Sequence, residues 1–147
     1  MKISTKGDYG IRALIELAHR YGEKRPTQSG DIAARQSIPE SYLEQLLTTL
    51  RRAGFVRSVR GPQGGHVLAR RPSEIAVSNV IEALEGPIID VDCLNHAGNC
   101  ATNGGCAQSE MWAAVREAVL GVLTTTTIAD LAERDRMAQP AGSRYII

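Results

Sequence analysis

The chain has 147 residues, 43% of them hydrophobic, so it is about one domain long and has enough apolar side chains for a buried core. No stretch approaches the roughly 20 apolar residues that a membrane-spanning helix needs, and no apolar leader precedes the first amphipathic pattern. We therefore expect a cytoplasmic globule without a membrane partner.

The net charge of +1 hides a division along the chain. Residues 1–72 carry 13 Lys plus Arg against 6 Asp plus Glu, a net +7, whereas residues 73–147 carry 4 against 10, a net −6. Such asymmetry indicates that the first half meets a polyanion and that the second half has another task. The alternative is ordinary solvated surface charge.

Three helices are predicted in the basic half. Apolar residues at helical spacing predict an amphipathic helix from Thr5 to about Tyr21, and Thr27 can cap a short second helix that ends near Ser37. Ser37 and Glu40 have the spacing of a capping box for a third helix. The apolar stripe of this third helix consists of Leu43, Leu46, Leu47 and Leu50.

A β-hairpin is predicted next. An alternating strand from Phe55 to Arg60 leads through a Gly-Pro-Gln-Gly-Gly tip into a second strand from His66 to Arg70. Two short helices followed by a basic hairpin are typical of a winged helix-turn-helix, which we assign to residues 1–72. The expected fold class is mainly α with a small β-hairpin wing.

Polar side chains at the start of the third helix lie opposite its leucines, where they can reach base edges in the major groove of DNA. Glu44 can accept a hydrogen bond from cytosine and is interpreted as a specificity filter, because Thr48 at i+4 offers it no ion pair. Arg60 and Pro62 lie at the wing tip, and a narrow minor groove attracts arginine. The predicted DNA-binding residues are Thr27, Gln28, Ser41, Tyr42, Glu44, Gln45, Arg51, Arg60, Pro62, Gln63 and Gly64.

The acidic half contains two further helical patterns. Residues 73–90 are assigned to a linking helix and connector, and residues 107–136 to a long helix followed by a short terminal one. The long helix has a broad apolar face made of Met111, Val115, Ala118, Val119 and Val122. We expect this face to form a twofold homodimer, with packing inside the chain as the alternative. Residues 137–147 are expected to form a flexible tail.

The three cysteines, Cys93, Cys100 and Cys106, all lie in a polar, glycine-rich loop assigned to residues 91–106. An odd number of cysteines in a reducing compartment argues against a disulfide framework and favours metal binding or reactive thiols. Thiolates suit iron-sulfur clusters or zinc. The C-x6-C-x5-C spacing differs from the closer cysteine pairs of zinc modules, which favours the cluster over zinc.

Several of these stretches closely resemble the Rrf-two family of bacterial transcription regulators, which includes IscR-like and NsrR-like members. The likeness begins at "KGDYGIRAL", continues through "SYLEQL", the wing motif "RGPQGG", "VSNVIEALEG" and the cysteine loop, and reaches "TIADLAER". The resemblance implies a homodimeric winged-helix protein that binds near-palindromic double-stranded DNA, and we expect it to act as a repressor. It also implies an iron-sulfur cluster, 4Fe-4S or 2Fe-2S, that senses redox state, nitric oxide or iron-sulfur status.

Three cysteines leave one cluster ligand to be supplied. In IscR-like members this ligand is a histidine three residues after the last cysteine, and here that position is Ser109. In some NsrR-like members it is an aspartate of the first helix, contributed across the dimer, and Asp8 matches that position. Thr5 and Asp8 also have capping-box spacing, which is the local alternative for this aspartate. His96 is the other candidate ligand.

An enzyme is not expected. Cys93 and His96 could serve as nucleophile and base, but the sequence lacks an oxyanion motif, a nucleotide loop and an orienting carboxylate arrangement. The competing hypothesis is a winged-helix regulator without a cluster, which would respond through cysteine oxidation, zinc or a protein partner.

Overall fold

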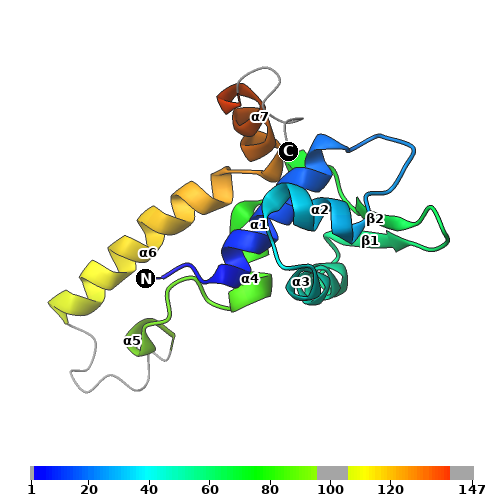
Figure 1. Ribbon diagram of the computed structural model, residues 1–147. Coiled ribbons are helices and arrows are strands. Elements are labelled where there is room, and N and C mark those ends of the chain that lie inside the picture. Colours follow the sequence, from blue (N-terminus) through cyan, green and yellow to red (C-terminus); the bar gives the residue numbers. More distant parts are fainter. Residues whose placement is uncertain (1, 96–105, 140–147) are drawn as a thin grey trace.

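The computed structural model describes residues 2–95 and 106–139, and it confirms a mainly helical winged-helix fold (Figure 1). The elements in chain order are α1 (Thr5–His19), α2 (Ser29–Gln36), α3 (Glu40–Arg52), β1 (Val56–Val59), β2 (Gly65–Leu68), a 3-10 turn η1 (Pro72–Glu74), α4 (Val77–Glu85), α5 (Asp92–Asn95), α6 (Ala107–Thr125) and α7 (Ile128–Ala138). No helix within the described ranges is long and apolar enough to cross a membrane.

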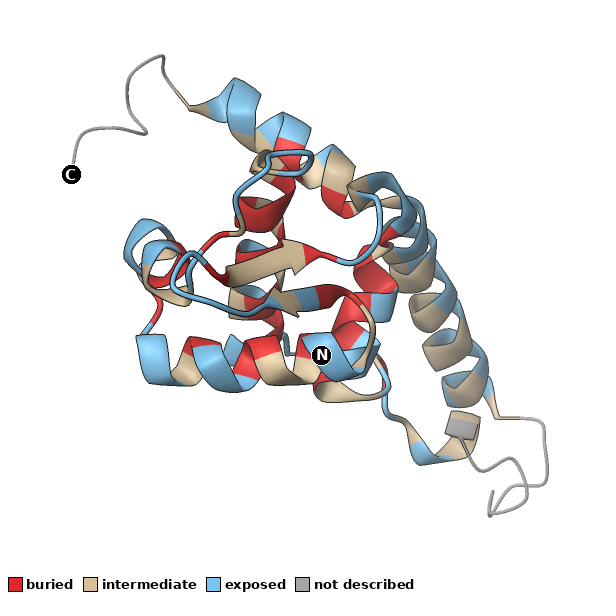
Figure 2. Ribbon diagram, turned by 90° about the vertical axis from the view of Figure 1, so that its right-hand side faces the viewer, coloured by how far each residue is buried: buried red, intermediate tan, exposed pale blue. Residues whose placement is uncertain are grey.

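The core lies between α1, α2, α3 and α4, and it is closed by the wing and by the start of α7 (Figure 2). The four leucines predicted for the third helix are all buried on one side of α3, as their spacing requires. Around them the largest fully buried side chains include Leu14, Ile32, Ile75, Val80 and Ile128. This arrangement turns the opposite face of α3 toward solvent.

The wing is an antiparallel pair in which Val56 faces Leu68 and Val59 faces Gly65. Close to the wing tip, β2 is also attached to the segment before α2. The Thr27 amide donates to the His66 carbonyl oxygen at 2.9 Å, and the His66 amide donates to the Thr27 carbonyl oxygen at 2.7 Å. A Cβ atom at Gly65 would collide with the backbone of Thr27, so this close approach requires glycine.

The predicted helix caps are wrong because other contacts take their place. Ser37 adopts a left-handed conformation with φ 54° and ends α2, while Pro39 precedes α3 without a side-chain cap. Thr27 is buried in the pairing with His66, and Gln28 occupies the N-cap position of α2. A side chain with capping chemistry is therefore not sufficient to cap a helix when tertiary contacts hold its backbone elsewhere.

Helix α1 is capped from a distant part of the chain. A carboxylate oxygen of Glu85, at the end of α4, accepts hydrogen bonds from the Ser4 amide at 2.9 Å, from the Gly7 amide at 3.0 Å and from the Ser4 hydroxyl. A Cβ atom at Gly7 would lie 2.6 Å from that oxygen. The contact satisfies amides that helix geometry leaves without partners and fixes α1 against α4.

Helix α6 leaves this core, and α7 returns to it. Backbone hydrogen bonds pair Ala76 with Thr127, so the chain returns to the start of α4 once α6 has ended. Helix α7 then packs on α1, where the His19 Nε2 atom lies 2.7 Å from a carboxylate oxygen of Asp135. Helix α7 ends at Ala138, inside the tail of residues 137–147 that was expected to be flexible. Residues 140–147 of that tail lie outside the described ranges.

Candidate nucleic-acid interface and cysteine segment

The exposed face of α3 presents three of the predicted base-reading residues. Ser41, Glu44 and Gln45 are all exposed and lie opposite the buried leucines. The hydroxyls of Thr48 and Thr49 donate to the carbonyl oxygens of Glu44 and Gln45, at 2.9 and 3.2 Å, and are thereby satisfied within the helix. The side chains nearest the start of α3 are thus the ones available to a partner.

Glu44 lies close enough to His66 of the wing to influence its ionisation. Burial lowers the pKa of His66 below 6.5, the Glu44 carboxylate raises it partway back, and Arg51 lowers it. The Nδ1 atom of His66 is buried and has no hydrogen-bond partner among the described residues. Glu44 therefore sits in an electrostatic group with the wing rather than in an i, i+4 ion pair.

Two of the predicted contact residues also hold α3 in place. An Arg51 guanidinium nitrogen donates to the Ser58 hydroxyl at 3.1 Å and joins α3 to β1. The Tyr42 ring is half-buried and packs edge-on against Tyr9 of α1, with 5.9 Å between ring centroids. Both side chains orient α3 relative to its neighbours, in addition to any contact they make with DNA.

The wing tip displays Arg60, Pro62 and Gln63, which are all exposed. Gly64 is different, because its amide donates to the Gly61 carbonyl oxygen at 2.9 Å and a Cβ atom there would collide with the Val59 carbonyl oxygen. It shapes the tight tip and has no amide left for a phosphate, so we remove it from the predicted DNA-binding residues.

Thr27 is also unsuited to the DNA contact predicted for it. Its relative exposure is 2%, and its backbone is engaged with His66 as described above. A side chain in the interior cannot reach a duplex, so the role of Thr27 is to fasten the wing to the segment before α2. Gln28, the next residue, is exposed and stays in the set.

Two arginines that sequence reasoning did not single out lie beside these residues. Arg20 and Arg25, on the turn between α1 and α2, line a hollow of about 330 Å³ together with Gln28 and the wing-tip residues Pro62 and Gln63. The signal in the sequence is the run "RYGEKRPTQ", residues 20–28, which contains both arginines and contributes to the positive charge of the first half. The fold brings this turn to the wing.

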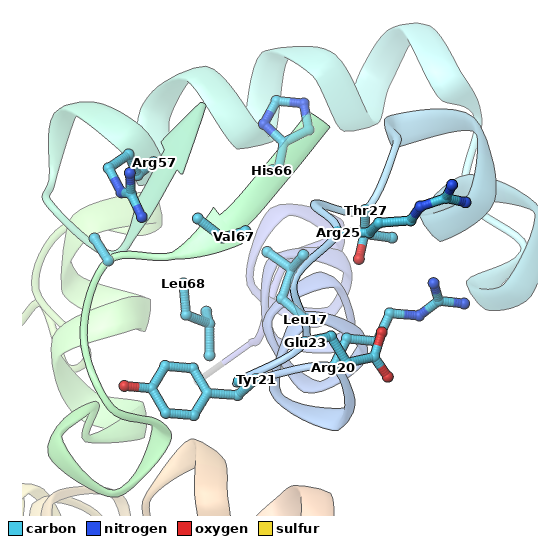
Figure 3. A pocket seen from close by; sticks show the side chains of 12 residues that line it. Leu17, Arg20, Tyr21, Glu23, Arg25, Thr27, Arg57, His66, Val67 and Leu68 are labelled. Atoms are coloured by element: carbon cyan, nitrogen blue, oxygen red, sulfur yellow. The ribbon is translucent and has the colours of Figure 1, made fainter. Parts of the chain in front are cut away.

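A second hollow of about 400 Å³ lies between the same turn and β2 (Figure 3). Apolar side chains of Leu17 and Leu68 form part of its wall. Figure 3 shows the Arg20 and Arg25 side chains extending to the same side, next to α2, while Arg57 lies on the other side of the hollow. The turn between α1 and α2 is thus a basic ridge between two hollows.

The cysteine segment is described in part. Cys93 lies in α5 and Cys106 immediately precedes α6, two elements that contact each other, and both thiols are free and half-buried. Cys100 and His96 lie outside the described ranges. Among the residues described, no three His, Cys, Asp or Glu side chains gather into a metal site. The predicted ligand set therefore stays a prediction.

Asp8 is exposed on the first turns of α1, and its carboxylate forms an ion pair with Arg12 at 3.1 Å. Ser4 precedes the helix without a side-chain cap, so the predicted capping box of Thr5 and Asp8 is wrong. Arg12 also lies over the Tyr9 ring, 5.5 Å from its centroid. The position of Asp8 leaves its carboxylate accessible to a second chain.

Comparisons with known proteins agree with this architecture. The Rrf2 (Rrf-two) family, described as an iron-dependent transcriptional regulator, matches residues 3–134. The chain is 44% identical over 146 residues to the HTH-type transcriptional regulator CymR of Bacillus subtilis, covering 99% of this chain and 100% of that one. It is 34% identical over 145 residues to the HTH-type transcriptional regulator IscR of Klebsiella pneumoniae, covering 99% and 88%.

The fold comparison gives the same result. The solved structure of CymR, described as the global cysteine regulator of B. subtilis, matches with a TM-score of 0.79 and 43% identity, covering 91% of this chain and 98% of that chain. The matched family and both of these relatives, CymR and IscR, are named as transcriptional regulators, which confirms the expectation that the chain is not an enzyme.

Proposed function

The chain belongs to the Rrf2 family of transcriptional regulators, and from this premise we propose that it binds near-palindromic double-stranded DNA as a homodimer and acts as a repressor. Helix α3 enters the major groove, and the wing follows the backbone into the adjacent minor groove. The observation that carries the proposal is the polar, exposed face of α3 beside a basic wing. The proposed contact residues are Gln28, Ser41, Tyr42, Glu44, Gln45, Arg51, Arg60, Pro62 and Gln63.

The dimer proposal is supported by α6. This helix buries none of its 19 residues, and Met111 and Val122 are 50% and 64% exposed. Together with Ala118 they form an exposed apolar stripe at helical spacing, on a different side of α6 from Leu123, which packs against the core. A second copy that covers this stripe would place the two α3 helices about one turn of DNA, or a small multiple, apart.

We further propose that Cys93, Cys100 and Cys106 hold an iron-sulfur cluster, 4Fe-4S or 2Fe-2S. The donors fit, because Cys93 and Cys106 are free thiols on contacting elements. The description of the matched family as iron-dependent supports the proposal separately. Asp8, contributed across the dimer, is the proposed fourth ligand, with His96 as the alternative. When bound, the cluster supplies iron that changes state with redox conditions, nitric oxide or iron-sulfur supply.

The competing function is a regulator that senses through its cysteines alone. It is favoured by the similarity to a protein described as a global cysteine regulator. The half-buried thiols of Cys93 and Cys106 are also compatible with direct oxidation or with zinc.

Purification without oxygen, with visible spectra and iron and sulfide analysis, separates the two functions. A cluster predicts a brown chromophore that is lost on replacing any of the three cysteines by serine and kept in the matched variant Ser109→Ala. Loss of the chromophore in Asp8→Ala but not in His96→Ala would assign the fourth ligand. A colourless, iron-free wild-type protein would leave the cysteine-only function.

The same preparations test whether the cluster controls DNA binding. A coupling of about 1–3 kcal/mol predicts that loss of the cluster changes affinity for the operator by about 5- to 150-fold at fixed salt. The measurement is titration of labelled operator DNA with holo and apo protein. Equal affinities would rule out sensing through the cluster.

A further inference from the structure

The hollow between the α1–α2 turn and the wing tip has the chemistry of an anion site. Arg20 and Arg25 line it, and neither forms an ion pair with any residue in the described part of the chain. Two guanidinium groups without carboxylate partners are left on one side of the turn, where Figure 3 shows both side chains extended alongside α2. Elsewhere the fold does pair arginines, as it pairs Arg12 with Asp8.

The walls of this hollow are held in a fixed relation to each other. The backbone pairing of Thr27 with His66 attaches the turn to β2, and the Gly64 amide closes the wing tip on the Gly61 carbonyl oxygen. Gln28 and Gln63 line opposite walls, one at the start of α2 and one at the wing tip, and both side chains carry amide donors. An anion that enters meets a preformed set of donors.

We propose that this hollow binds a backbone phosphate of the DNA duplex beside the wing, an inference that rests on the proposed DNA-binding function. Guanidinium groups match phosphate oxygens in geometry and charge, and the amino end of α2 adds a partial positive charge. The location favours DNA over a free anion, because Gln28 and Gln63 belong to the two elements that flank the DNA-reading helix. The contact positions the duplex without reading its sequence.

Asp31 gives the proposal a second, opposite test. It lies in the first turn of α2 and lines the same hollow, where its carboxylate repels a phosphate. The site therefore carries two positive charges against one negative charge. Removing the guanidinium groups should weaken DNA binding, whereas Asp31→Asn should strengthen it.

The experiment uses the full chain and a labelled duplex of mixed sequence, with fluorescence anisotropy measured over a range of salt concentrations. The variant Arg20→Gln with Arg25→Gln should bind more weakly than wild type on every sequence, and the slope of log K against log salt should fall by about 1 per lost phosphate contact. The matched control is Arg134→Gln with Arg136→Gln, which removes the same charge from exposed positions on α7. It should leave the slope close to that of wild type.

Each outcome has one meaning. If wild type binds the duplex and the Arg20 and Arg25 variant keeps the wild-type slope, the phosphate site is wrong while the proposed function stands. If wild type does not bind any duplex, the proposed function fails first. Calorimetric titration with inorganic phosphate should show no saturable binding; saturable binding that the double variant abolishes, with the DNA slope unchanged, would assign the hollow to a free anion instead.

Discussion

Helices α3 and α6 both carry an apolar stripe, but the described part of the chain covers only the stripe of α3. The 13 residues of α3 include four buried leucines, whereas the 19 residues of α6 include no buried residue at all. The leucines of α3 are enclosed by α1, α2, α4 and the wing, while α6 contacts α4 along one side and exposes Met111 and Val122 on another. The difference shows that α3 is stabilised by its own chain, whereas α6 keeps exposed apolar area, which the proposed dimer would cover.

The largest expected effect comes from truncating a buried leucine of α3. Leu47 is 1% exposed, so Leu47→Ala should lower the free energy of unfolding by about 2–5 kcal/mol through lost burial and a residual cavity. Urea unfolding followed by circular dichroism measures the change. Gln45→Ala, on the exposed face of the same helix, should stay within about 0.5 kcal/mol of wild type. Similar losses for both variants would contradict the assigned faces of α3.

A charge on the exposed stripe of α6 tests the other half of the contrast. Val122→Glu should weaken the dimer by more than about tenfold, because association would bury an unpaired carboxylate. Sedimentation velocity over a dilution series measures this shift, and DNA affinity should fall with it. Thr124→Glu adds the same charge to an exposed position on a different side of α6 and should leave the dimer intact. A Val122→Glu protein that stays dimeric would move the interface away from this stripe.

The smallest predicted effect concerns the contact between α3 and the wing. Burial, the largest cause, lowers the pKa of His66 below 6.5 in the folded protein. Below pH 6.5 the unfolded chain therefore binds this proton more readily, so the contribution of His66 to stability is complete above that pH and declines as the pH falls toward the lower folded-state value. Urea midpoints at a series of pH values should show the decline in wild type and a shallower one in His66→Gln. Identical profiles would contradict the buried, neutral imidazole.

The parts of the fold that were predictable are those governed by local spacing. The leucine stripe of α3 has a helical period and one buried side, so both the helix and its exposed face follow from the sequence. The helix caps were not predictable in this way, because Glu85 caps α1 from the far end of α4 and Thr27 is held by His66. Such contacts depend on which elements meet in three dimensions.

In the candidate site, too, some residues were predictable from local sequence pattern and others were not. Ser41, Glu44 and Gln45 were found from the amphipathic pattern, and Arg60 from the wing motif. Arg20 and Arg25 were missed because nothing in their immediate neighbourhood indicates that the turn folds against the wing. Local pattern predicts which side of an element is polar, while the grouping of polar sides from different elements follows from tertiary packing.

The pairing of Thr27 with His66 has a consequence for how the proposed dimer tolerates altered operators. These two hydrogen bonds tie the wing to the segment that leads into α2, and the hydrogen bond from Arg51 to Ser58 ties it to α3, so α3 and the wing are held together as one unit. An inserted or deleted base pair between half-sites rotates one half-site around the duplex axis, and a unit held together in this way cannot follow it by bending. The proposed dimer would then accept only one spacing between half-sites, and the contact between the two copies of α6 would set that spacing.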